Sequence, residues 1–102
     1  MEFIDVCSLD ELPPGKSRPV RAAGRDVALF NVGGIVHAIE NSCPHQGAAL
    51  SGGEFCGRVV KCGAHGLRFD VTTGVMVGSD KLRVPCYPVE VTDGRVAVAV
   101  NA

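Results

Sequence analysis

Apolar and polar positions alternate along short segments of the chain, and this pattern predicts a protein built from β-strands. The clearest segment is 95–100, where valine occupies every second position. Successive side chains of a strand point to opposite faces, so these valines share one face. Asp93-Gly94, a strong hairpin signal, separates this segment from another that contains Val89 and Val91 on alternate positions. The C-terminal part is therefore predicted to be a β-hairpin.

A second hairpin is predicted around Gly33-Gly34, which connects alternating segments at 25–32 and 35–40. The remaining predicted strands are short and lie between glycine and proline turns, at 2–6, 18–22, 58–61, 67–70 and 74–77. We interpret Glu54-Phe55-Cys56-Gly57 as a turn. Thirteen glycines and six prolines interrupt the sequence. Many short strands with such turns predict an all-β antiparallel sandwich or small barrel.

One helical turn is predicted at 8–12. Ser8 is in the N-cap position and Glu11 stands three residues later, as in a capping box. Pro13-Pro14-Gly15 follows and ends the turn. With 102 residues and no repeats, the chain is predicted to form a single domain, 1–102.

Composition and charge exclude several classes of protein. Hydrophobic residues make up 46% and charged residues 21%, and the net charge is −1. No basic cluster supports binding to nucleic acid or to an anionic membrane, and no apolar run is long enough to span a bilayer. The N-terminus has neither a basic nor an apolar region typical of a signal peptide. We therefore expect a cytoplasmic protein that binds neither nucleic acid nor membranes.

The five cysteines indicate metal rather than disulfides. Their number is odd, and nothing in the sequence indicates secretion. Cys7, Cys56 and Cys86 stand outside any motif, and we interpret them as small apolar fillers, with a functional thiol at Cys56 or Cys86 as the alternative. Cys43 and Cys62 each lie in a loop that also contains a histidine.

The two loops carry Cys43-x-His45 and Cys62-x-x-His65, separated by the sixteen residues 46–61. Short spacing places the two ligands of each loop around one centre. Two thiolates on one iron and two imidazoles on the other is the ligand set of a Rieske [2Fe–2S] cluster. We expect Gly47 and Gly66, which lack a Cβ, to let backbone N–H groups come close to the cluster sulfurs.

Two cysteines and two histidines also suit a structural zinc site. The Cys-x-His spacing is short for a zinc knuckle, which favours iron and sulfur, but the spacing alone leaves both cofactors open. A zinc-stabilised binding module therefore remains an alternative to a redox protein.

At these residues the chain resembles the Rieske ferredoxin family. The resemblance rests on Cys43-Pro44-His45-Gln46-Gly47-Ala48-Ala49-Leu50, Cys62-Gly63-Ala64-His65-Gly66 and Phe69-Asp70-Val71-Thr72-Thr73-Gly74, and it covers almost the whole chain. It implies a Rieske-type β-sandwich with a small cluster-binding subdomain, about 41–70, made of two loops. It also implies one [2Fe–2S] cluster held by Cys43, His45, Cys62 and His65, with the histidines bound through Nδ1 near the surface.

The sequence departs from the family pattern in the second loop, where Gly63 replaces a frequent proline and Ala64 a frequent bulky residue. High-potential Rieske proteins, which this chain resembles in its ligands, add a disulfide between the loops and hydroxyl donors to the cluster. Ala48 and Ala64 occupy the disulfide positions, and Leu67 and Phe69 occupy those of the donors. We therefore expect a low potential, roughly −150 mV.

The histidine count limits the chemistry. The chain has three histidines, so two cluster ligands leave only His37. A 2-His-1-carboxylate iron site cannot be assembled from one histidine, and His37 is interpreted as structural or exposed. No G-x-G-x-x-G or P-loop motif indicates a nucleotide site. No catalytic residue is therefore predicted.

The resemblance implies a monomeric one-electron carrier. It would take electrons from an NAD(P)H-dependent flavin reductase and deliver them to a terminal oxygenase, an aromatic-ring dioxygenase. The expected docking residues adjoin the ligands: Pro44, Gln46, Gly47, Gly66, Leu67 and Pro85. The alternative from the same resemblance is the small subunit of an assimilatory nitrite reductase, which would bury a larger apolar face.

Overall fold

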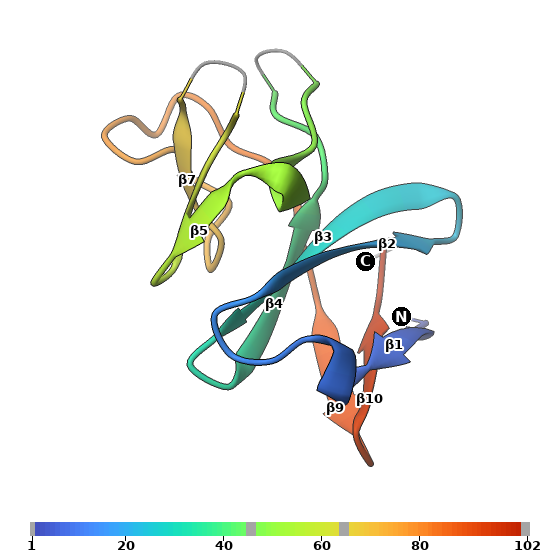
Figure 1. The fold of residues 1–102 in the computed structure, drawn as a ribbon. Helices are drawn as coiled ribbons and strands as arrows, with labels where there is room; N and C mark the ends of the chain where they lie inside the picture. The colour runs from blue at the N-terminus through green and yellow to red at the C-terminus, as the bar shows by residue number, and fades with distance from the viewer. Residues whose placement is uncertain (1, 45–46, 64–65, 101–102) are drawn as a thin grey trace.

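The computed structural model describes residues 2–44, 47–63 and 66–100, and within them the protein is built almost entirely from antiparallel strands (Figure 1). The elements are β1 Ile4–Ser8, η1 Leu9–Glu11, β2 Ser17–Ala22, β3 Arg25–Val32, β4 Ile35–Glu40, η2 Leu50–Gly52, β5 Glu54–Cys56, β6 Val59–Lys61, β7 Arg68–Asp70, β8 Cys86–Tyr87, β9 Val89–Thr92 and β10 Arg95–Val98. The predicted all-β fold is confirmed. Neither helical element of the described residues is long enough to cross a membrane.

The strands form three sheets with the orders β1-β10-β9, β2-β3-β4-β8 and β5-β6-β7. In Figure 1 the β5-β6-β7 sheet lies at one end of the molecule, and the β1-β10-β9 sheet lies at the other end. The four-stranded sheet runs between them. We call 41–85 the loop lobe and the remainder of the chain the base.

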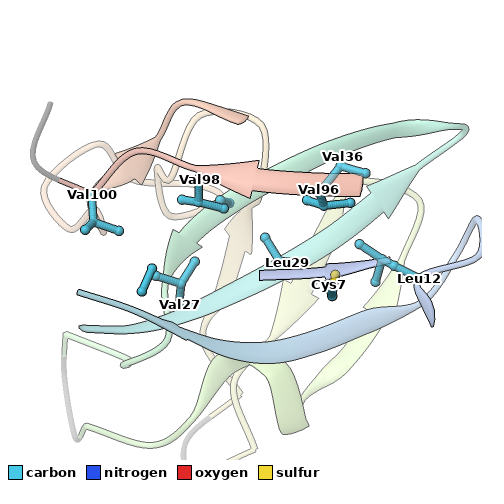
Figure 2. Packing of buried hydrophobic residues seen from close by; sticks show 10 residues of the cluster. Cys7, Leu12, Val27, Leu29, Val36, Val96, Val98 and Val100 are labelled. Carbon is cyan, nitrogen blue, oxygen red and sulfur yellow. The ribbon is translucent and has the colours of Figure 1, made fainter. Parts of the chain in front are cut away.

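The central strand β3 is apolar on both faces because it separates two cores. Val27 and Leu29 belong to the base core, with valines of β10. Figure 2 shows these two side chains opposite Val96 and Val98. Ala28 and Phe30, on the alternate positions, belong to the second core beneath the loop lobe. This explains why 27–30 is a continuous apolar run, as expected for a strand buried on both sides.

Both predicted hairpins are confirmed, and the φ angles of their turns explain why glycine or aspartate occupies the turn positions. Gly33 and Gly34 have positive φ angles of 59° and 103°, and Asp93 and Gly94 have φ of 52° and 76°. Two consecutive positive φ values are favoured in two-residue hairpin turns, because their twist matches that of the strands. Strands β3 and β4 begin and end where the alternation predicted.

The predicted turn at 8–12 also forms, as the 3-10 turn η1. Asp10 N–H donates to Ser8 Oγ at 3.3 Å, and the Ser8 backbone N–H donates to Glu11 Oε2 at 3.1 Å. The capping box is therefore present.

Two local predictions are wrong. The segment 74–77 makes only isolated bridges, Phe69 with Met76 and Val75 with Arg83, and is not a strand. Conversely, the interpretation of 54–57 as a turn is wrong, because Glu54–Cys56 is β5, paired with β6. Strand β8, two residues paired to β4, was not predicted at all. Elements this short contain too few positions for alternation to be recognised, and their pairing partners decide their conformation.

Candidate metal centre

The two cysteine-bearing loops have the same backbone hydrogen-bond pattern. In the first loop, Cys43 N–H donates to the Ala48 carbonyl at 2.8 Å, and Gly47 N–H donates to the Cys43 carbonyl at 2.7 Å. In the second loop, Cys62 N–H donates to the Leu67 carbonyl at 2.7 Å, and Gly66 N–H donates to the Cys62 carbonyl at 3.0 Å. Each loop therefore closes on its own cysteine, with the same spacing of these two hydrogen bonds.

Gly47 and Gly66 occupy equivalent positions, with φ of 74° and 73°. This left-handed conformation favours glycine at both turns. Their amides donate to the carbonyls of Cys43 and Cys62. The glycines therefore act first by closing the turns.

The structure brings two of the four predicted ligands together. Cys43 and Cys62 are 2% and 1% exposed, and both belong to the second core, with Leu50, Val60 and Phe69. His45 and His65 lie outside the described residues. Packing alone does not require two loops to have the same hydrogen-bond pattern. Two buried thiols, one at the base of each loop, are therefore better explained as ligands of one metal cluster than as residues that only fill the core.

The other cysteines differ from one another. Cys7 is buried in the base core, as predicted for a filler, and burial raises the pKa of its thiol. Cys56 and Cys86 are exposed, so their interpretation as small apolar fillers is wrong. The alternative, a functional thiol at either residue, stays a prediction. Burial of part of Cys86 still raises the pKa of its thiol, aided by the charge of Asp70. Neither Cys56 nor Cys86 belongs to the second core that contains Cys43 and Cys62, so neither is a candidate for a further ligand there.

A side-chain clamp, which the sequence did not reveal, ties together the two ends of the first loop. Asn41 precedes Cys43, and its Nδ2 donates to Ser51 Oγ at 2.9 Å. Ser51 N–H donates back to Asn41 Oδ1 at 2.8 Å. Ser17 of β2 then donates from Oγ to the Ser51 carbonyl at 3.1 Å, which anchors the clamp to the base.

An aromatic contact makes a second connection between the base and the loop lobe. The rings of Phe30 on β3 and Phe55 on β5 meet edge to face, with centroids 4.9 Å apart. Such pairs stabilise beyond the area they bury. Phe55 is partly buried and packs against the second core, so it connects β5 to that core.

Close backbone packing supports the second loop. A Cβ at Gly53 would overlap the Lys61 carbonyl oxygen, so only glycine lets the end of the first loop lie against β6. Strands β6 and β7 pair Lys61 with Arg68 and lead into and out of the loop. Cys62 is thus held directly at the end of a hydrogen-bonded ladder.

Asp70 organises the turn after β7. Its Oδ1 accepts from Thr72 N–H at 2.9 Å and Thr72 Oγ1 at 2.6 Å, and its Oδ2 accepts from Arg58 Nε at 2.9 Å. Partial burial acts to raise the pKa of Asp70, but the Thr72 hydrogen bonds and the Arg58 charge outweigh it and lower the pKa. Gly74 completes the turn, where a Cβ would overlap the Val84 carbonyl oxygen. This explains the Asp70-x-Thr72-x-Gly74 spacing.

Comparison with known proteins agrees with this geometry. The family model for the Rieske [2Fe-2S] domain matches residues 2–88. The ferredoxin component of the naphthalene 1,2-dioxygenase/salicylate 5-hydroxylase systems of Ralstonia sp. is 36% identical over 97% of this chain and 96% of its own. The chain belongs to the Rieske [2Fe-2S] family.

Two solved structures are similar over nearly the whole chain. One is a complex of reduced oxygenase and oxidised ferredoxin in carbazole 1,9a-dioxygenase, in which the matching chain has a TM-score of 0.88 and 35% identity, covering 95% of this chain and 92% of that one. The other is a putative NADH-dependent nitrite reductase small subunit from Mycobacterium tuberculosis, with a TM-score of 0.89 and 34% identity, covering 99% and 96%.

Family membership decides between the two cofactors that the ligand spacing left open. The cofactor is a Rieske-type [2Fe–2S] cluster, which supplies one-electron chemistry, and a structural zinc ion is not needed to explain the loops.

Proposed function

We propose that Cys43, His45, Cys62 and His65 hold one Rieske cluster, with the cysteines on one iron and the histidines on the other. The observation that carries this proposal is the pair of matched loops, each closed on a buried cysteine of one core. In this proposal 1–102 is one domain and about 41–70 is its cluster-binding subdomain. Val71 and Val84 pack on the same core beyond that boundary.

We further propose that the protein is a cytoplasmic, monomeric shuttle. It would receive single electrons from a flavin-dependent NAD(P)H reductase and pass them to a terminal oxygenase, a dioxygenase. The support is likeness to a ferredoxin component of a dioxygenase system and to a ferredoxin solved in complex with its oxygenase. The chain itself carries electrons and is not the catalyst.

Visible absorption and low-temperature EPR spectra, before and after dithionite, test the cofactor and its ligands. We expect a brown protein that bleaches on reduction and then gives an EPR signal with the low average g value of mixed Cys and His ligation. Replacing His45 or His65 with Cys should shift that g value toward the all-cysteine type. A colourless protein, or one whose signal is already of the all-cysteine type, would contradict the assignment.

The expected potential is low. Leu67 and Phe69 carry no hydroxyl, and Phe69 is fully buried in the second core. With few donors to the cluster, the reduced state is weakly stabilised, and we expect a midpoint of roughly −150 mV. Protein-film voltammetry measures it, and a midpoint above zero would contradict this reasoning.

Partner docking is proposed next to the ligand loops. Pro44, Gly47 and Pro85 are exposed, Gly66 and Leu67 are partly buried, and Gln46 lies outside the described residues. Leu67→Glu should raise the apparent KM for the ferredoxin in a reconstituted oxygenase assay while the visible spectrum stays normal. Ile35→Glu is the matched control, since Ile35 is a 66% exposed residue of the base. An unchanged KM for Leu67→Glu would argue against this face.

A second candidate function is the small subunit of a nitrite reductase, favoured by the similarity to the Mycobacterium tuberculosis protein. Purification from the native host at low salt discriminates the two. A shuttle elutes alone, whereas a fixed subunit elutes with a large partner that contains the catalytic site.

A further inference from the structure

Charged side chains are divided unevenly between the two parts of the molecule. The loop lobe has more basic than acidic residues: Arg58, Lys61, Arg68, Lys81 and Arg83 against Glu54, Asp70 and Asp80. Its side chains therefore sum to +2. The base has five basic and eight acidic residues and sums to −3, which together give the net charge of −1. An oxidised cluster with two thiolate and two neutral imidazole ligands is formally neutral, so it leaves this sign unchanged.

Ion pairing sharpens the contrast. Among the described residues of the base, four of the five basic side chains pair with a carboxylate and Lys16 does not: the pairs are Arg18–Glu11, Arg21–Asp26, Arg25–Glu40 and Arg95–Asp5. In the loop lobe, Arg58 pairs with Asp70. Lys61 and Arg68 form no ion pair with any described residue. The positive charge that remains available to a partner therefore gathers in the loop lobe.

Lys61 and Arg68 are directly opposite one another on neighbouring strands, β6 and β7. Both are exposed, whereas Val60, which precedes Lys61, and Phe69, which follows Arg68, are buried in the second core. Like charges placed directly opposite in a sheet are destabilising. Glu54, opposite Lys61 on β5, offsets part of this repulsion. An anionic group that lay over both side chains would offset their remaining repulsion. The pair therefore favours binding of an anionic partner next to the ligand loops.

The same face has an apolar centre. An open pocket of about 350 Å³ lies over the sheet, lined by Lys61 and Arg68, by Val59 and Val77, and at its β5 side by Glu54 and Cys56. Val77 is 42% exposed, and its N–H donates to the Arg68 carbonyl at 2.7 Å, which holds it beside β7. Exposed apolar residues rimmed by charge are typical of a protein interface.

This face adjoins the second ligand loop. Lys61 is the residue before Cys62, and a Cβ at Gly66 would lie 3.3 Å from Lys61 Cε, so the lysine side chain runs along the loop. A partner bound over Lys61 and Arg68 would therefore approach the loop that carries Cys62.

We propose that the outer face of the β5-β6-β7 sheet, centred on Lys61 and Arg68, is a docking surface for an acidic face of a redox protein partner. Carboxylates of the partner lie over the two cations, and Val59 and Val77 supply the apolar contact. In the complex one electron leaves this protein and reduces the partner by one, with no bond formed or broken. This inference rests on the proposed electron-carrier function and adds the chemistry of the partner.

Net charge and local charge predict opposite outcomes, which makes the proposal testable. One-electron reduction adds a negative charge to the cluster, so the reduced protein has a net charge of about −2 and should react faster with a basic acceptor. A basic surface beside the loops should instead favour an acidic acceptor. The probes are two haem proteins of opposite charge, acidic cytochrome b5 and basic cytochrome c. Stopped-flow mixing with the dithionite-reduced protein, freed of excess reductant, gives the second-order rate constant for each probe over a range of ionic strength.

We expect the rate with cytochrome b5 to fall by roughly threefold or more as salt is raised from low to physiological concentration and above, because screening removes the attraction. Lys61→Gln/Arg68→Gln should lose most of this salt dependence. The control Lys16→Gln/Arg21→Gln removes the same charge from the base and should keep it. The midpoint potential of each variant separates a change in docking from a change in driving force.

The other outcomes overturn the proposal. A wild-type rate with cytochrome b5 that rises with salt would show that net charge prevails, and this result needs no variant. Equal loss of salt dependence in both double variants would show that position is irrelevant. A protein without a reducible [2Fe–2S] spectrum would contradict the electron-carrier function and this inference with it, whereas a normal spectrum with the wrong salt dependence contradicts the docking surface alone.

Discussion

The two cores on either side of β3 are built differently. The base core lies between a three-stranded and a four-stranded sheet, and its ten buried members, apart from Cys7, are aliphatic. The core of the loop lobe is covered by strands of only three residues and by two loops, and it contains both Cys43 and Cys62. Long ladders stabilise the base, whereas turns, side-chain clamps and the cofactor must stabilise the loop lobe. Each of the following predictions tests that difference.

The largest effect is expected from removing Cys43, one of the four proposed cluster ligands. Cys43→Ser should abolish iron binding, because a cluster cannot be retained with one thiolate missing, and metal binding is coupled to folding of its site. Amide hydrogen exchange should then lose protection in 41–85 while β3, β4 and β10 keep theirs. Cys56→Ser is the control, since Cys56 is exposed and should leave the iron content unchanged. Equal loss of protection in both parts would refute the independence of the base.

The next effect compares neighbours on opposite faces of β3. Phe30→Ala should cost about 3–5 kcal/mol and Leu29→Ala about 2–5 kcal/mol, since both side chains are fully buried. Phe30 also loses its contact with Phe55. We expect Phe30→Ala to accelerate iron loss to a chelator, and Leu29→Ala to lower the denaturation midpoint with a smaller effect on iron loss. Identical iron-loss rates in the two variants would show that the cores are one unit.

A smaller effect is expected from replacing one asparagine in each part of the molecule, the half-buried Asn41 of the loop lobe and the buried Asn31 of the base. Asn41→Ala breaks the clamp with Ser51, and Asn31→Ala leaves the Leu12 carbonyl and the Gly34 amide of the base without their partner. Each should cost about 1–3 kcal/mol. Iron release should be faster in the Asn41 variant, whereas chemical denaturation of the base should respond to the Asn31 variant. Faster iron release in the Asn31 variant would contradict a local role for the clamp.

The smallest effect concerns pH. The folded-state pKa of Asp70 is lowered, so its stabilisation is present above the unfolded pKa, about 3.9, and is lost as pH falls through the folded pKa. The free energy of unfolding should therefore differ most between the wild type and Asp70→Asn near neutral pH. The difference should shrink in acid below about pH 4. A difference that is constant from pH 7 to pH 3 would mean that the charge of Asp70 does not contribute.

The amino-acid sequence by itself determined the features that depend on residues close together in the chain. The strands 25–32 and 35–40 and the hairpins at Gly33-Gly34 and Asp93-Gly94 follow from alternation and turn chemistry over a few positions. The capping box of Ser8 and Glu11 is equally local. The two Cys/His loops were recognised because the ligands of each loop stand within three residues of one another.

Tertiary structure decided what depends on partners far away in the chain. The two-residue β8 exists because it pairs with β4, and β5 because Phe55 packs on Phe30 and the strand pairs with β6. Cys56 and Cys86 are exposed although their local sequence is apolar enough for a core. The opposed cations Lys61 and Arg68 become neighbours only through the register of β6 and β7. The local sequence pattern predicts which face of its own strand a side chain occupies. The residue opposite that side chain is decided only when strands distant in the sequence pair.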